Sequence, residues 1–195
     1  MPTAPSVIVL AGPNGAGKST SAPWLIQDLL GVGEFVNADV IARGLSAFEP
    51  ERAAMAAGRI MLARLKELGD SGETFAFETT LASKSFVSRI AALQRSGYEF
   101  HLFFLWLPSA DLSVSRVADR VRSGGHDVPE QTIRRRYESG LANFFKLYMP
   151  MTTSWGFFDG SHPSYPECIA QGSGKSVSNV FRHQLWDAIQ NRFGS

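Results

Sequence analysis

A nine-residue stretch near the N-terminus constrains the fold of this chain more than any other feature. It reads Gly12-Pro13-Asn14-Gly15-Ala16-Gly17-Lys18-Ser19-Thr20 and fits the pattern G-x-x-x-x-G-K-[ST] at every constrained position. A short apolar, β-branched run, residues 7–11, precedes the stretch. Apolar residues at roughly helical spacing follow it, namely Trp24, Leu25, Leu29 and Leu30. A strand, a glycine-rich loop and a helix in this order predict a site that binds phosphate.

Each residue type in the stretch has a chemical role. Glycines let the backbone bend so that successive N–H groups face one anion, and the following helix adds the positive end of its dipole. Lys18 supplies a mobile positive charge for the outer phosphates, and Ser19 supplies a hydroxyl ligand for Mg²⁺. Residues 12–20 are therefore predicted to bind a nucleoside triphosphate, ATP or GTP. A glycine-rich turn that binds nothing would not explain why loop, lysine, hydroxyl and flanking elements agree.

Composition narrows the class of protein. The chain has 195 residues, which suits one domain, and 19 Lys and Arg nearly balance 18 Asp and Glu. The net charge of +1 gives no support for a nucleic-acid or anionic-membrane partner. Cys168 is the only cysteine, so an intramolecular disulfide cannot form. The first apolar run breaks at Gly12, and no other approaches the roughly 20 residues of a membrane span. We expect a soluble, cytoplasmic protein.

Strand-like and helix-like segments alternate along the chain. Strands are predicted at residues 7–11, 34–38, 75–77, 100–107, 155–158 and 167–170. Helices are predicted after the glycine loop and at residues 40–45, 50–68, 83–95, 109–122, 129–148 and 177–193. This rhythm predicts a three-layer α/β fold of the P-loop NTPase, nucleotide-kinase-like type, with a mainly parallel sheet in a single domain, residues 1–195. Asp39 and Glu78 should then lie with the glycine loop at the carboxyl ends of the strands, where ligands collect.

The same glycine loop occurs in transporter-type ATPases, so that class must be considered. Such ATPases need a serine-glycine-glycine signature followed by a strand that ends in Asp-Glu. Ser123-Gly124-Gly125-His126 resembles the signature, but no such strand follows it. The chain after the loop is also too short for the usual intervening helical subdomain. The compact layout suits a kinase that phosphorylates a small acceptor.

Two carboxylates are candidates for the chemistry. A kinase needs a group beside the acceptor hydroxyl to position it and to take its proton. Asp39 is well placed for this role at a strand end, although aspartate there is equally suited to cap the helix that begins at Val40. Glu78 has three readings: it binds the acceptor, orients Mg²⁺ through water, or is simply solvated. Thr79 and Thr80 are either strand formers or hydroxyl donors to a ligand.

Arginines on two adjoining helices are candidates for binding the transferred phosphate. With Ile133 at zero and about 100° per residue, an apolar stripe covers about 20° to 120°: Tyr137, Leu141, Phe144, Phe145 and Tyr148. Arg134 falls inside this stripe, whereas Arg135 and Arg136 fall outside it. Arg116 and Arg120 share one face of the preceding helix. The two helices, joined by Gly124-Gly125, are predicted to form a small lid at about residues 110–148. The alternative is a solvated basic face with an internal salt bridge for Arg134.

These residues together resemble the zeta-toxin type of P-loop kinase. The resemblance runs from Val7 to about Tyr148 and depends on the glycine loop and three further segments: 36–39 (Val-Asn-Ala-Asp), 77–80 (Phe-Glu-Thr-Thr) and 120–129 (Arg-Val-Arg-Ser-Gly-Gly-His-Asp-Val-Pro), with the arginines after it. Members phosphorylate UDP-N-acetylglucosamine or a related sugar nucleotide, often as the toxic half of a toxin–antitoxin pair. The resemblance thus implies an ATP- and Mg²⁺-dependent kinase with a nucleotide-sugar acceptor and a small helical antitoxin as partner.

The resemblance also implies roles for individual residues. Asp39 matches the catalytic base and Lys18 the phosphate-binding lysine. Glu78 and Thr80 match the Glu-x-Thr that holds the acceptor sugar, and Asn37 joins them as a substrate contact. Arg120 and Arg134 match the two arginines on the transferring phosphate. Because the alignment on Pro129 needs one extra residue, Arg122 and Arg135 stay open for that role.

Two departures from the family pattern bear on the acceptor. Toxin members often have a basic residue two positions after the Glu-x-Thr, where this chain has Ala82. Related stand-alone kinases often have Asp-Asn-Ser where this chain has Asp159-Gly160-Ser161. Two other functions therefore stay open from the residues. One is a nucleoside, cofactor or amino-alcohol kinase on the same scaffold, and the other is a nucleotide-dependent binding protein with slow ATP hydrolysis.

Overall fold

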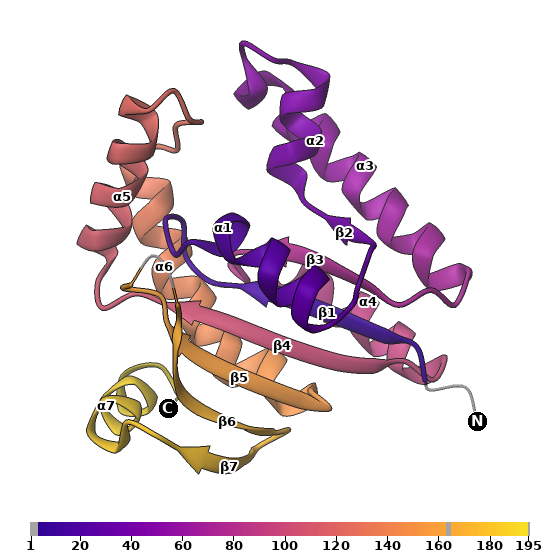
Figure 1. Ribbon diagram of the computed structural model, residues 1–195, viewed down its shortest axis with the longest axis vertical. Coiled ribbons are helices and arrows are strands. Elements are labelled where there is room, and N and C mark those ends of the chain that lie inside the picture. The colour runs from indigo at the N-terminus through magenta and orange to yellow at the C-terminus, as the bar shows by residue number, and fades with distance from the viewer. Residues whose placement is uncertain (1–3, 163–164, 195) are drawn as a thin grey trace.

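Within residues 4–162 and 165–194, which the computed structural model describes, seven strands form one sheet in the order β2-β3-β1-β4-β5-β6-β7 (Figure 1). The strands are β1 (Ser6–Ala11), β2 (Phe35–Val36), β3 (Phe75–Thr79), β4 (Glu99–Trp106), β5 (Ser154–Asp159), β6 (Glu167–Ser173) and β7 (Ser176–Val180). β1 to β5 are parallel, and β6 and β7 are antiparallel. The predicted α/β fold with a mainly parallel sheet is confirmed.

The central strands are apolar because helices cover them on both faces. β1 pairs with β3 on one side and with β4 on the other, and Val7, Leu10, Phe100 and Leu102 are fully buried. A nearly continuous apolar sequence is expected for such a strand. In parallel register the ends of β1 and β3 coincide, since Leu10 lies opposite Glu78. The sheet therefore brings the start of the glycine loop and Glu78 together.

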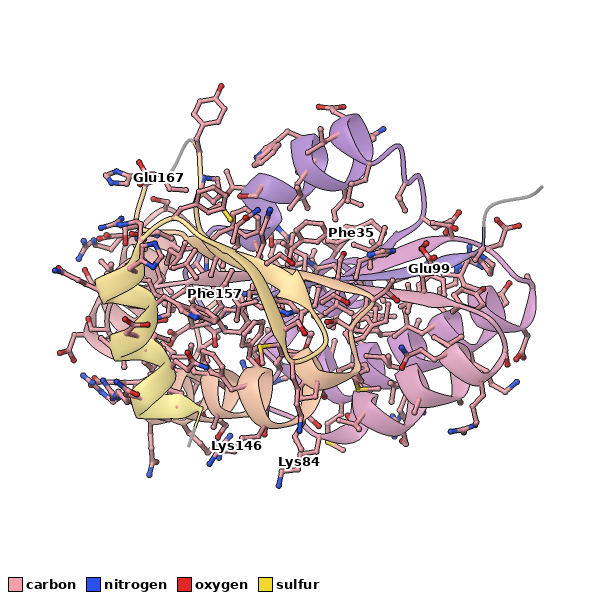
Figure 2. All side chains as sticks on the ribbon, turned by 90° about the horizontal axis from the view of Figure 1, so that it is seen from below. Phe35, Lys84, Glu99, Lys146, Phe157 and Glu167 are labelled. Atoms are coloured by element: carbon pink, nitrogen blue, oxygen red, sulfur yellow. The ribbon has the colours of Figure 1, made fainter. Side chains whose placement is uncertain are left out.

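Helices flank the sheet in the alternating order that the sequence predicts. They are α1 (Lys18–Ala22), α2 (Ala38–Leu45), α3 (Pro50–Asp70), α4 (Ser85–Arg95), α5 (Ala110–Arg122), α6 (Glu130–Asn143) and α7 (His183–Phe193), with π-helical turns η1 (Pro23–Leu29) and η2 (Phe144–Tyr148) and a 3₁₀ turn, η3 (Met149–Met151). α1 covers one face, and α4, α6 and α7 cover the other (Figures 1 and 2). In Figure 1, α2 and α3 rise on one side of the glycine loop and α5 rises on the other. Among the helices of the described ranges, none combines the length and hydropathy of a membrane span.

Aromatic side chains hold the C-terminal part of the sheet against its helices. Phe157 of β5 stacks on Phe104 of β4 with ring centroids 5.1 Å apart, and Phe144 lies 5.1 Å from both rings. Trp186 of α7 stacks on Trp155 at 5.4 Å. Phe157 is enclosed, whereas the labelled lysines lie at the outer surface (Figure 2). Burial of such large rings makes β5, β6 and α7 part of the same core as β1 and β4.

Two predictions about local structure are wrong. The predicted closing helix over 177–193 begins only at His183, because Ser176–Val180 forms the edge strand of a hairpin. The turn of this hairpin uses Gly174 at φ +52°, a conformation that favours glycine. After the glycine loop, α1 passes at Pro23 into η1, so Leu29 and Leu30 point to solvent and not into the core.

The helix predicted over 129–148 changes its geometry midway. α6 ends at Asn143 and continues as the π-helical turn η2, whose wider turns move every later residue backwards around the axis. The buried residues of α6 itself are Ile133, Tyr137, Gly140, Leu141 and Asn143. At about 100° per residue their mean direction lies near that of Ile133, which places Arg136 at the edge of the buried arc and Arg134 outside it. The orientation predicted for these two arginines is therefore wrong.

Candidate active site

A pocket of about 800 Å³ lies at the carboxyl ends of the parallel strands, where ligands of open α/β sheets bind. The glycine loop and α1 form one wall, and α2, α3 and the end of β3 form the second. α5 and α6 contribute the third, through Arg116, Arg120 and Arg136. Parts of the chain as distant as residues 14 and 166 therefore meet in one cavity.

Two glycines bend the backbone of the glycine loop, and Lys18 binds two of its carbonyl oxygens. Gly15 and Gly17 adopt φ of +77° and +82°, which other residues rarely adopt. Lys18 Nζ donates to the carbonyl oxygens of Gly12 and Pro13, both at 2.9 Å. Gly12 and Pro13, predicted to contact the nucleotide, thus bind the lysine, and the pocket lining begins at Asn14. Because side chains already bind these carbonyl oxygens, backbone N–H groups of the loop are left to face an anion.

Lys18 is a buried cation at the base of the pocket. Its side chain is only 6% exposed, and this burial lowers its pKa, while the charges of Glu78 and Asp39 oppose the shift. The ammonium group lies 3.7 Å from Glu78 Oε1. An anionic ligand would compensate a buried ammonium, so the position suits the phosphate-binding role predicted for this lysine.

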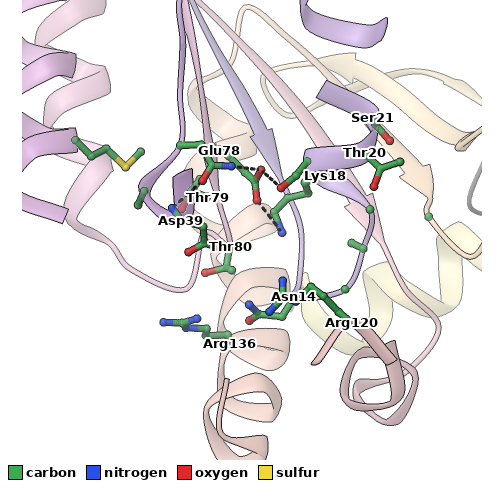
Figure 3. A pocket seen from close by; sticks show the side chains of 18 of the residues that line it. Asn14, Lys18, Thr20, Ser21, Asp39, Glu78, Thr79, Thr80, Arg120 and Arg136 are labelled. Carbon is green, nitrogen blue, oxygen red and sulfur yellow. Dashed lines mark hydrogen bonds and ion pairs between the residues drawn. The ribbon is translucent and has the colours of Figure 1, made fainter. Parts of the chain in front are cut away.

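Glu78 accepts hydrogen bonds from two sides at the end of β3 (Figure 3). Ser19 Oγ donates to its Oε2 at 2.8 Å, and Asn37 Nδ2 donates to the same oxygen at 2.7 Å. The solvated reading of Glu78 is therefore wrong. The Ser19 hydroxyl and the Glu78 carboxylate are hard oxygen donors side by side, as Mg²⁺ prefers when phosphates and water complete its shell. The residues present fit the predicted magnesium ion.

Asp39 lies in the first turn of α2 and lines the pocket (Figure 3). The alternative that Asp39 caps this helix is wrong, because the cap is Asn37, whose Oδ1 accepts from the backbone N–H groups of Asp39 at 2.7 Å and Val40 at 3.2 Å. The Asp39 carboxylate is exposed toward the pocket and acts electrostatically on both Lys18 and Arg136.

The loop after β3 presents Thr80 to the pocket and is held by α6. Leu81 is fully buried at φ +55°, a strained conformation for leucine. Its carbonyl oxygen accepts from Asn143 Nδ2 at 2.7 Å. Gly140 of α6 packs so closely that a β-carbon there would approach the Thr80 carbonyl oxygen to 2.4 Å. α6 therefore fixes the backbone that carries Glu78 and Thr80.

Of the arginines predicted to bind phosphate, some line the pocket and others are exposed at the surface. Arg120 lines the pocket, donates to the His126 carbonyl oxygen at 2.6 Å and keeps its buried Nε without a hydrogen-bond partner among the described residues. Arg134 does not reach the pocket, since it is exposed and pairs with Asp111 at 2.7 Å and Glu130 at 2.8 Å. The open alternatives Arg122 and Arg135 are also exposed and line no part of it.

Arg136 occupies the position that sequence reasoning gave to Arg134. It is half-buried beneath Thr80 (Figure 3), and burial lowers its pKa, an effect that Asp39 opposes and Arg135 reinforces. No hydrogen bond or ion pair to its guanidinium is found within the described ranges. Sequence reasoning missed Arg59 as a pocket residue, together with the apolar side chains of Met55, Leu62 and Phe86. The buried arc of α6 alone, without η2, would have identified Arg136.

Comparison with known proteins agrees with this fold. An uncharacterized protein of Haemophilus influenzae is 28% identical over 130 residues, which are 67% of this chain and 91% of that protein. A chain of the AvrRxo1-ORF1:-ORF2 structure with ATP superposes with a TM-score of 0.71 at 16% identity; the match covers 96% of this chain but 64% of the other. A chain of the Streptococcus pneumoniae PezAT toxin–antitoxin structure superposes with a TM-score of 0.68 at 17% identity, and the match covers 97% of this chain and 78% of the other. At these identities the structural likeness concerns the fold.

The sequence comparison defines the family. The model of the AAA domain family matches residues 7–144, which include the glycine loop, the end of β3 and all of α5 and α6. The matched region makes up more than half of the chain. This protein belongs to the AAA domain family.

Proposed function

We propose that the protein transfers the γ-phosphoryl group of ATP, or of GTP, to a hydroxyl group of a small molecule, and that the acceptor is a nucleotide sugar such as UDP-N-acetylglucosamine. The arrangement that carries this proposal is a carboxylate, Asp39, across one pocket from the glycine loop with its buried Lys18, while Arg120 and Arg136 enter from a third side. Phosphoryl transfer needs little besides placement and neutralisation of charge, and these groups supply both.

Each of these residues would have its own role in the reaction. Asp39 accepts the proton of the acceptor hydroxyl as its oxygen forms a bond to the γ-phosphorus. The bond between the γ-phosphorus and the bridging oxygen breaks, and the nucleoside diphosphate leaves with its charge held by Lys18 and the N–H groups of residues 14–20. Arg120 and Arg136 neutralise the negative charge of the phosphoryl oxygens during transfer. Arg136 thereby takes the role that the sequence analysis assigned to Arg134. Ser19 and Glu78 would hold Mg²⁺, which neutralises charge on the phosphates when bound.

The acceptor would occupy the half of the pocket between β3 and α3. Asn37, Glu78 and Thr80 are the polar groups proposed for its sugar, although the hydrogen bond from Ser19 gives Glu78 a second role beside the metal. Met55, Leu62 and Phe86 add an apolar wall opposite them. Hydroxyl-bearing acceptors with a flat or apolar portion fit such a lining better than a wholly polar one.

Two larger-scale features complete the proposal. α5 and α6 form the lid at about residues 110–148; because Ser113 and Ile133 are buried, motion would concentrate near Gly124-Gly125. A small helical antitoxin is the proposed protein partner, in line with the similarity of the fold to the PezAT toxin–antitoxin structure. Growth of cells expressing the wild type or the inactive Asp39→Asn variant, with and without a candidate antitoxin, tests that partner: only the wild type should be toxic alone.

Incubation with ATP, Mg²⁺ and a panel of acceptors, followed by mass spectrometry for an added phosphate, tests the reaction. We expect a nucleotide sugar to be phosphorylated, and Asp39→Asn to lose about 10²–10⁴-fold in rate, the range typical of a general base. Asp187→Asn, an exposed carboxylate of α7, serves as the matched control and should keep full activity. Phosphorylation of a nucleoside or amino alcohol would reassign the acceptor. ATP binding without any product, or an unchanged rate in Asp39→Asn, would refute the assignment.

A further inference from the structure

A short turn after β5 lies against the outer side of the glycine loop. This turn, residues 159–161, begins at the last residue of β5 and is joined to β4 by a hydrogen bond from Gly160 N to the Trp106 carbonyl oxygen at 2.8 Å. A β-carbon on Gly160 would lie 2.9 Å from the Ala16 carbonyl oxygen. The backbone of the turn is therefore packed directly on the backbone of the loop, and only glycine fits between them.

Arg116 of α5 donates hydrogen bonds to both the glycine loop and the turn. Its NH1 donates to the carbonyl oxygens of Gly15 at 3.2 Å and Gly160 at 2.7 Å, and its NH2 donates to the carbonyl oxygen of Ser161. A planar guanidinium with several N–H donors can bridge two backbone segments in this way, whereas an ammonium group acts as a point charge. One turn of α5 earlier, Ser113 Oγ donates to the Asn14 carbonyl oxygen.

Asp159 holds the turn from its other side. The carboxylate is 6% exposed and does not line the pocket. Its Oδ1 accepts from Ser161 N at 2.8 Å, and its Oδ2 lies 3.3 Å from NH1 of Arg182, which also pairs with the exposed Glu167. The contacts form a chain from Arg182 through Asp159 and Ser161 to Arg116 and Gly15.

We infer that Arg116 and Asp159 are positioning residues for the phosphate loop, an inference that rests on the proposed binding of a nucleoside triphosphate there. The carbonyl oxygens of residues 12 to 15 all accept hydrogen bonds from side chains: the first two from Lys18, the third from Ser113 and the fourth from Arg116. A released carbonyl could rotate inward and repel a phosphate oxygen, so preorganisation of the loop depends on these donors. Arg116 acts through Gly15, and Asp159 acts through the turn that Arg116 binds.

A double-mutant cycle tests the inference, because Arg116 also lines the pocket and would otherwise be assumed to touch the phosphates. The affinities of ATP and of inorganic tripolyphosphate, each with Mg²⁺, are measured by calorimetry for wild type, Arg116→Met, Asp159→Ala and the double variant. We expect losses of about 10-fold for Arg116→Met and at least 3-fold for Asp159→Ala, with the double variant no weaker than Arg116→Met, since both act through one turn.

Further variants separate positioning from general damage. Asp159→Asn keeps an acceptor for Ser161 N and should recover most of the affinity, whereas Arg116→Lys should not. Glu167→Gln changes the other partner of Arg182 and should bind within 2-fold of wild type. If Asp159→Ala does not fold, Gly160→Ala moves the same turn and should weaken binding of tripolyphosphate at least 3-fold. In steady state, the KM for ATP should rise more than kcat falls.

The outcomes are distinct. Losses that multiply in the double variant mean that Arg116 contacts the phosphates independently, and they overturn the inference. So does unchanged tripolyphosphate affinity in Asp159→Ala or Gly160→Ala. If wild type itself binds neither ATP nor tripolyphosphate, the proposed function has failed instead.

Discussion

At the scale of single residues, Arg136 is the clearest case of a group that needs a ligand. Its half-buried guanidinium has no ion-pair partner within the described part of the chain, and it keeps its charge although burial lowers its pKa, because an arginine pKa is far above neutrality. The charge therefore raises the free energy of the empty pocket until an anion arrives. Arg134, two residues earlier, already has Asp111 and Glu130 as partners and has no such requirement.

The two neighbours allow a matched comparison. We expect Arg136→Met to lower kcat by about 10²–10³-fold, as loss of one group that stabilises transition-state charge typically does. Arg134→Met should change kcat less than twofold, since its carboxylate partners lie outside the pocket. Initial rates with the identified acceptor measure both. Equal losses in the two variants, or a larger loss in Arg134→Met, would contradict the geometry of α6.

The sequence alone located the glycine loop and the carboxylates of the pocket, but it failed where helix geometry is irregular. The glycine loop, Asp39 and Glu78 follow strands in a motif of fixed spacing, so their place depends only on the parallel sheet. Arg134 was misplaced because the 100° count treated Phe145 and Tyr148 as part of one α-helix, while both lie in the π-helical turn η2. Contacts such as Arg116 with Gly160 join distant segments and leave no periodic signal.

At the scale of elements, α6 and η2 support the loop that follows β3 and presents Thr80 to the pocket. Gly140 packs on Thr80, Asn143 binds the Leu81 carbonyl oxygen, and Tyr148 OH donates to the Ser83 carbonyl oxygen at 2.6 Å. These contacts oppose the strain of Leu81 at φ +55°. β6 was predicted as a strand, but β7 was mistaken for the start of the closing helix, because its pairing with β6 leaves no signal in the local sequence.

Tyr148 makes this support sensitive to alkaline pH. Burial raises its pKa from 10.0 to about 12. Between these values the unfolded chain has lost the phenol proton and the folded chain has kept it, so the free energy of unfolding falls as pH rises. We expect Tyr148→Phe to be less stable than wild type by about 1 kcal/mol at pH 8, through loss of a buried hydrogen bond.

Above pH 10 the difference in free energy of unfolding between wild type and Tyr148→Phe should decrease by up to about 1.4 kcal/mol per pH unit. Urea unfolding at pH 8, 10 and 11 measures the difference. Tyr165→Phe, at a tyrosine that is 77% exposed, is the control and should follow wild type throughout. A difference between wild type and Tyr148→Phe that stays constant with pH would contradict the role of burial.

At the scale of the whole molecule, the pocket joins parts that would otherwise be far apart. The glycine loop, the helices α2 and α3, and the helices α5 and α6 each contribute lining residues. A ligand that contacts all of them binds only the folded chain. Binding should therefore stabilise the entire fold and not just the loop.

Mg²⁺ and ATP at about 100 times the dissociation constant should raise the free energy of unfolding by about 2.7 kcal/mol. For a chain of this size the corresponding rise in melting temperature is roughly 5–10 °C. Thermal unfolding followed by circular dichroism measures the shift. Lys18→Met should abolish most of the shift while it keeps the fold. An equal shift in this variant would place the nucleotide elsewhere.

The turn after β5 limits how far the chain can be shortened. The family match ends at residue 144, and a fragment cut there would retain Lys18, Asp39 and the four arginines that line the pocket, Arg59, Arg116, Arg120 and Arg136. Without β5, however, one side of β4 would have no partner strand. The fragment would also lack Gly160, which packs against the Ala16 carbonyl oxygen. The pocket is thus lined from both sides of the boundary at which sequence similarity ends, since Gly160 and Pro166 complete a wall that begins at Asn14.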